Sequence, residues 1–177
     1  PAAPKKTDYL PLRTLVLDGK ARVGALTAKG MKIQDINLKM TGRNGVIQID
    51  PLLANLYKGT LAAKAAVDVR QDAPRSNLAL QVKSVQAGPL LQDYLKKDFL
   101  DGTANVEANI STVGDAPDRI KRSLNGKGQA VFSNGAITGI DLAGMIRNVT
   151  SSFGLTQPGA EKPRTDFSEL NAPFTIT

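Results

Sequence analysis

Apolar and polar residues alternate along much of the chain, and this alternation predicts a mainly β fold. Every second residue is apolar in several runs, and short turns that contain Gly or Pro separate these runs. The apolar positions of three such runs are Leu61, Ala63, Ala65, Val67 and Val69, then Leu78, Leu80 and Val82, then Ala104, Val106, Ala108 and Ile110. A strand with one apolar and one mixed side is typical of an antiparallel sheet that is covered on one side.

The stretch 124–147 adds turn and helix features to the same pattern. Ala130 and Phe132 share one side of a strand. Asn134-Gly135 predicts a two-residue hairpin turn, because both central positions of a type I′ turn need positive φ. Gly139 is expected to break the returning strand. Asp141 can then cap a helix that runs to about residue 152.

Two further segments carry helix features, so we expect two or three short helices among about eight strands. Gly88-Pro89 begins a run with apolar residues at helical spacing. Asp115 is the expected N-cap of a second short helix, with Asn125-Gly126 as its end. Asp50-Pro51 is expected to end the short strand that starts at Val46.

The composition removes the commonest catalytic and metal-binding side chains. The chain has no Cys and no His, which excludes thiol nucleophiles, histidine bases and zinc sites of the usual kind. No Asp-rich calcium loop is present. The carboxylate pairs Asp98/Asp101 and Asp115/Asp118 are explained as turn and cap residues, whereas a Ser–Lys arrangement such as Ser151 with a distant Lys stays open. We expect no enzyme activity, no cofactor and no metal.

The net charge of +7 favours anionic partners, either nucleic acid or the phosphates of a membrane surface. The cations are scattered along the chain, and it contains no Trp. A nucleic-acid platform needs aromatic rings beside cations. The pattern therefore indicates a solvated basic surface, and we expect no nucleic-acid binding.

Several motifs resemble the C-terminal region of the AsmA family of Gram-negative bacteria. The most specific is a G-A-I-x-G-I-D-L run preceded by L-x-G-x-G, whose matching residues are Leu124, Gly126, Gly128, Gly135, Ala136, Ile137, Gly139, Ile140, Asp141 and Leu142. An N-G…D-P-L…L-Y-x-G segment at residues 44–59 and a T-x-F-x-x-L segment at 165–170 also resemble the family. Lys58 stands at a turn where the family usually has Gly. The resemblance covers roughly residues 12–174.

Together, pattern and resemblance predict a mainly β (α+β) fold, a curved antiparallel sheet or half-barrel groove with two or three short interrupting helices. Residues 1–10 are expected to be a partly ordered lead-in, and 11–177 one domain. The chain begins at Pro1 without Met and ends inside a strand-like run, so we expect it to be part of a longer protein. The resemblance implies a periplasmic region of an inner-membrane-anchored protein.

By the same resemblance, AsmA-type proteins are similar to repeating β-groove lipid-transfer proteins and are linked to outer-membrane biogenesis. They are associated with lipopolysaccharide levels, outer-membrane protein assembly and phospholipid passage. The implied partners are phospholipid acyl chains, the membrane through the parent's anchor, and envelope assembly proteins. Ala130, Phe132 and the three apolar runs above are then the candidate lipid groove.

Two interpretations of these apolar runs remain open. In the first, they form a groove that holds lipid, and the small Ala and Val side chains leave room for a guest chain. In the second, they form the closed core of an interaction module for envelope assembly. The pattern alone favours the closed core, whereas the resemblance favours the groove.

Overall fold

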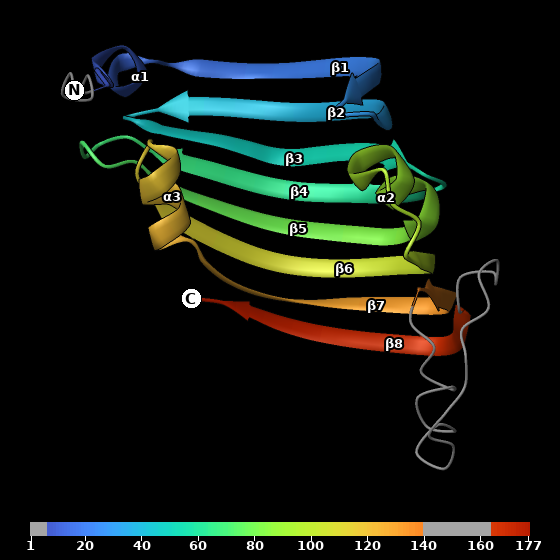
Figure 1. The fold of residues 1–177 in the computed structure, drawn as a ribbon. Helices are drawn as coiled ribbons and strands as arrows, with labels where there is room; N and C mark the ends of the chain where they lie inside the picture. The colour runs from blue at the N-terminus through green and yellow to red at the C-terminus, as the bar shows by residue number, and fades with distance from the viewer. Residues whose placement is uncertain (1–6, 140–163) are drawn as a thin grey trace.

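The structure is a computed structural model that describes residues 7–139 and 164–177, and these residues form one eight-stranded antiparallel sheet. The strands lie side by side in sequence order, so each pairs with the next along the chain (Figure 1). The elements are α1 Leu10–Thr14, β1 Leu17–Ala28, β2 Met31–Arg43, β3 Val46–Leu56, β4 Gly59–Asp68, β5 Arg75–Gln86, α2 Ala87–Leu95, β6 Leu100–Val113, α3 Pro117–Ser123, β7 Asn125–Thr138 and β8 Arg164–Ile176. The predicted fold class is confirmed: the sheet is open, with β1 and β8 as its edge strands.

Short polar connections join the early strands, as the sequence predicts. Asn44 and Gly45 both have positive φ between β2 and β3, and Lys29-Gly30 makes the turn between β1 and β2. The turn between β3 and β4 is formed by Tyr57 and Lys58, both with positive φ. Because the connections are tight, neighbouring strands along the chain become neighbours in the sheet.

The predicted hairpin at Asn134-Gly135 is wrong. β7 runs without interruption from Asn125 to Thr138, and its partners are β6 and β8. Asn134 does have positive φ, 50°, but it lies at a β-bulge, where the pairing of β6 with β7 shifts between Asp101 and Thr103. Short polar residues tolerate positive φ equally well in a bulge and in a hairpin turn.

Three other boundaries also differ from the sequence prediction. β3 continues through a bulge at Asp50-Pro51 instead of ending there. The N-cap of α3 is Ala116, and Asp115 makes no capping bond because its carboxylate accepts hydrogen bonds from Thr7 and Tyr9. The C-cap of α3 is Leu124, in an extended conformation, and β7 starts at the next residue, so Asn125-Gly126 is no helix C-cap.

The end of β7 agrees with the prediction: the strand stops at Thr138 and Gly139 follows with φ of 93°. Asp141 and the helix expected over 141–152 lie outside the described residues.

Gly135 is predicted to be essential for the bulge, although for a reason other than a hairpin. A Cβ added there would lie 2.2 Å from the Asp101 backbone oxygen and 2.6 Å from the Phe167 ring. We expect Gly135→Val to destabilise the fold by about 1–3 kcal/mol or more, because backbone must move to admit the side chain. Thermal unfolding measures the effect. Gly24→Val in β1 is the matched control, since an added Cβ meets nothing within 4 Å there; equal melting temperatures for both variants would refute the steric explanation.

Candidate functional site

The pairing register places the predicted apolar runs on one face of the sheet, here called the apolar face. Residues that are direct neighbours across the strands form continuous rows. One row is Gly19, Met40, Ile49, Ala65, Leu78, Ile110, Gly126 and Ile176, and the next is Ala21, Leu38, Leu52, Ala63, Leu80, Ala108, Gly128 and Phe174. A third row runs from β3 to β8 through Ala54, Leu61, Val82, Val106, Ala130 and Ala172. Every position in these rows is glycine or apolar.

The candidate groove residues therefore come together with one exception. Phe132 and Ala104 are paired and extend the apolar face toward α2. Val69 is the exception, because β4 ends at Asp68 and the Val69 side chain is only 1% exposed. Its backbone N–H donates to Gly45 and its carbonyl accepts from Arg13 Nε, so it belongs to a closed end of the sheet.

The centre of the apolar face is half-exposed, whereas a core sealed under a second layer would be buried throughout. Leu61, Leu80, Val106 and Ile110 are each neither buried nor fully exposed. Only the small side chains Ala104 and Ala108 are buried among the candidate residues of β6. Within the described part of the chain, the central rows therefore have no layer that seals them, and the apolar face is open there.

The two ends of the apolar face are covered by helices. Figure 1 shows α2 and α3 on the same side of the sheet and at opposite ends of the strands. At the α2 end, Ile36, Ala54 and Val85 are buried, with Val85 fully so. At the α3 end, the hydroxyl of Thr112 donates to the Ile120 carbonyl of α3. The helices leave the middle of the face uncovered.

A tyrosine holds the α2 end together. The Tyr57 hydroxyl donates to Asp93 of α2 at 2.8 Å and accepts from the Lys32 backbone N–H at 3.2 Å. These bonds link β2, the β3–β4 turn and the helix. Burial, and then the hydrogen bond to Asp93, raise the pKa of Tyr57, so the hydroxyl keeps its proton at neutral pH.

A second tyrosine does the same at the α3 end. The buried Tyr9 donates its hydroxyl to Asp115 at 2.8 Å, and the Thr7 hydroxyl donates to the same carboxylate at 2.8 Å. These bonds, that from Thr7 first, lower the pKa of Asp115. The segment before α1 is thereby joined to the residues that precede α3.

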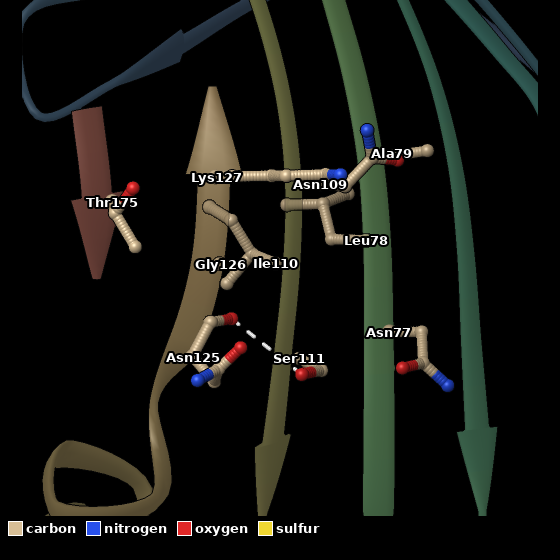
Figure 2. Close-up of a pocket in the computed structure, with 10 residues that line it drawn as sticks. All are labelled: Asn77, Leu78, Ala79, Asn109, Ile110, Ser111, Asn125, Gly126, Lys127 and Thr175. Carbon is tan, nitrogen blue, oxygen red and sulfur yellow. Dashed lines mark hydrogen bonds between the residues drawn. The ribbon is translucent and has the colours of Figure 1, made fainter. Parts of the chain in front are cut away.

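The opposite, polar face carries hollows that the sequence did not indicate. One, of about 450 Å³, is lined by Asn77, Asn109, Ser111, Asn125 and Lys127 among others (Figure 2). Another lies over Leu53, Ala62 and Ala79, beside the Gln81–Glu107 hydrogen bond of 2.7 Å. Small side chains between long polar ones create these depressions, and periodicity alone does not distinguish them from a solvated surface. Amides and an ammonium group border the first hollow, whereas Pro51, Leu53 and several alanines line most of the second.

The described residues contain no group of three or more acidic, Cys or His side chains that could hold a metal ion. The same described part has no helix long and apolar enough to span a bilayer. The chemistry of the site is therefore that of an apolar surface with polar edges.

Comparison with known proteins identifies related sequences. The model described as AsmA family matches residues 5–177. The chain is similar to Protein AsmA of Escherichia coli (strain K12), with 21% identity over 153 residues, which cover 86% of this chain and 25% of that protein. The chain thus spans about a quarter of the length of the curated relative that it matches. No solved structure is significantly similar to it.

An open apolar face predicts that a charge is tolerated at its centre. We expect Val106→Asp to keep the fold, because the half-exposed carboxylate can stay hydrated. Val85→Asp is the matched control under α2, where the same carboxylate would be buried and unpaired; that cost should unfold the chain. Circular dichroism and thermal unfolding compare the two variants. Unfolding of both would mean that the face is sealed.

The Tyr57 hydroxyl is predicted to stabilise the α2 end by about 1 kcal/mol, the typical net value of a hydrogen bond. Tyr57→Phe should therefore lower the melting temperature. Tyr94→Phe removes a hydroxyl from a 46% exposed side chain of the same helix and should have little effect. If the two variants melt alike, the Tyr57–Asp93 bond does not hold α2 in place.

Proposed function

The chain belongs to the AsmA family, and from that premise we propose that its apolar face holds lipid acyl chains without catalysing a reaction. The observation that carries this proposal is the unbroken set of apolar rows whose central residues stay half-exposed. A contiguous apolar surface that no second layer seals is a candidate binding surface.

The energetics of the rows favour an acyl guest. Eight strands spaced about 4.8 Å apart make a face roughly 34 Å wide. Each methylene that leaves water contributes about 0.8 kcal/mol, so a partly buried chain gains useful affinity without any polar contact. Ala63 and Ala65 lie near the centre of the face, and their small side chains cover less of the sheet than larger ones would. Farther along the same row Ala108 is buried and the Phe174 ring lies over Gly128, so the uncovered part of the face is centred on β4.

The family supports the biological setting of this proposal. We place the domain in the periplasm, as part of an inner-membrane-anchored protein of a Gram-negative bacterium that acts in outer-membrane biogenesis. Phospholipid acyl chains are the proposed ligand, and phospholipid transport between membranes is the proposed process. Protein partners from envelope assembly and a role in lipopolysaccharide biogenesis belong to the alternative, in which the domain is an interaction module. Because the match spans a quarter of the relative, these are proposals for the parent protein.

Lipid retention tests the proposal directly. Lipids are extracted from the purified chain and identified by mass spectrometry, and we expect phospholipid to co-purify with it. Val106→Asp should reduce bound lipid at least tenfold while the fold is retained, because the charge interrupts the central row.

Val131→Asp is the matched control, since Val131 pairs with Asn105 in the neighbouring row, which faces the other side of the sheet. It should keep its lipid. If the wild-type chain carries no lipid after reconstitution with phospholipid, or if both variants lose it equally, the groove function fails. The interaction module would then be the better explanation.

A further inference from the structure

The last residues of α2 and the loop that follows it combine exposed apolar side chains with lysines, and we propose that this segment docks the α2 end of the sheet onto an anionic lipid bilayer. Tyr94, Leu95 and Phe99 are 46%, 44% and 43% exposed. Lys96 and Lys97 lie between them in the sequence and are exposed as well. We call residues 94–99 the α2 tip.

The packing of α2 explains why these side chains face solvent. Leu90 and Leu91, earlier in the helix, are half-buried against the sheet. Lys96 then ends the helix in the left-handed conformation, with φ of 57°, and turns the chain away from the helix axis. Phe99 is fixed at the far side of the tip, where its carbonyl accepts from the Thr138 backbone N–H at 2.9 Å. The apolar side chains are thus presented by an ordered backbone.

The charges of the surrounding turns suit an anionic surface. At the α2 end, the β1–β2 turn contributes Lys29 and the β3–β4 turn contributes Lys58. The Lys96 ammonium lies close to Gly30 of the first of these turns. The ion pairs among the described residues involve none of Lys29, Lys58, Lys96 and Lys97. Asp93, Asp98 and Asp101 are the acidic groups nearby; Asp93 accepts from Tyr57 and Asp101 from the Gly102 backbone N–H.

The opposite end of the sheet differs in the way its cations are used. Exposed apolar residues occur there too, in and after α1, but Arg13 is paired with Asp72 and Arg70 with Asp68. The bond from Arg70 lowers the pKa of Asp68 to about 2, so that pair stays charged at neutral pH. Paired cations attract lipid phosphates less than unpaired ones. Lys121 and Arg122 of α3 are also exposed and take part in none of the ion pairs among the described residues. What distinguishes the α2 end is that the two lysines of the α2 tip lie between exposed apolar side chains in one short segment of the sequence.

This inference deepens the proposed function, because it identifies the end of the apolar face that meets a membrane. Aromatic side chains and lysines together are typical of segments that lie in the interface of a bilayer. Tyr94, Leu95 and Phe99 would enter the boundary between head groups and acyl chains, while Lys96 and Lys97 meet phosphates. A lipid leaving the bilayer would then reach the apolar rows past α2.

The absence of Trp from the chain provides a clean test of insertion. Phe99→Trp places a single fluorescent side chain at the α2 tip, and Val16→Trp places one at a 72% exposed position at the other end. With vesicles of phosphatidylcholine and phosphatidylglycerol, we expect the emission of Phe99→Trp to shift to shorter wavelength and that of Val16→Trp to stay unchanged. A shift for Val16→Trp alone, for both, or for neither overturns the assignment of the α2 tip.

Charge reversal tests the electrostatic part with a matched control. Lys96→Glu/Lys97→Glu should weaken binding to the same vesicles at least tenfold, given the usual attraction of a lysine to an anionic membrane surface. Lys121→Glu/Arg122→Glu makes the same change of charge in α3 and should have a far smaller effect. Equal weakening by both pairs would mean that net charge alone drives binding.

The fold of each variant is checked by circular dichroism, and Lys96→Gln/Lys97→Gln replaces the reversal if that variant unfolds. Bound lipid is measured in parallel. Lost vesicle binding with retained lipid in the α2-tip variants supports docking as a separate step from holding. A wild-type chain that carries lipid but binds no vesicles overturns the docking inference and leaves the proposed function intact. Capture of a protein through residues 94–99 without a vesicle response would likewise overturn it.

Discussion

The cross-strand register is the constraint on which this structure depends. Side chains alternate across a strand, so a slip of one residue between two strands would turn a whole apolar stripe to the other face. Eight strands remain in phase even though several carry bulges. Asp35, Ser84 and Asn134 have positive φ, and each lies at a register shift. Polar groups satisfy the irregular backbone at two of these bulges: Asn37 Nδ2 donates to the Asp35 carbonyl, and the Ser84 N–H donates to Asn105 Oδ1. The pairing returns to the same phase after each register shift, so the central rows stay apolar.

Among the described residues, no second layer covers the centre of the apolar face, and this affects both its stability and its capacity to bind a ligand. In the described residues the fully buried larger side chains are Val69 and Val85, and both lie at the ends of the strands. Backbone pairing and half-buried neighbours across the strands must therefore supply much of the stability of the centre. Burying apolar surface away from water lowers the free energy. The partly exposed rows can still gain this free energy by binding an apolar ligand, whereas a sealed core has gained it on folding. The polar face also exposes apolar area at Leu53, but its amides and the Lys64–Asp50 pair interrupt that surface.

Periodicity predicted the strands and the stripes because each strand pairs with its neighbour in sequence, and local alternation then determines the face. Leu61, Leu80 and Val106 could be assigned to one surface for this reason. The misassigned residues are those whose partner is distant or ambiguous. Asn134 has the backbone of a turn residue, but β6 already lies beside it and converts the feature into a bulge. Asp115 has the side chain of an N-cap, but Thr7 and Tyr9, more than a hundred residues away in the sequence, take its carboxylate. Val69 follows the alternation of β4 but lies one residue beyond its end. Contacts between residues far apart in the sequence decide these positions, and the local pattern of apolar and polar residues does not show such contacts.

The two ends of the apolar face are held by similar hydrogen bonds but differ in the arrangement of their charged side chains. At each end a tyrosine hydroxyl donates a hydrogen bond of 2.8 Å to an aspartate in or near a helix. Tyr57 donates to Asp93 of α2, and Tyr9 donates to Asp115 just before α3. Beside α3, Arg13 and Arg70 are paired with aspartates, while Lys121 and Arg122 are exposed on the helix. At the α2 tip, Lys96 and Lys97 lie between exposed apolar side chains in the sequence. A surface that binds along its whole length would need no such difference. The proposed exchange of an amphipathic ligand with a bilayer uses this difference, because lysines attract the head group at the strand ends beside α2 while the tail enters the uncharged rows, which run across the strands. The α2 end is therefore the end of the strands at which we propose that the apolar face meets a bilayer.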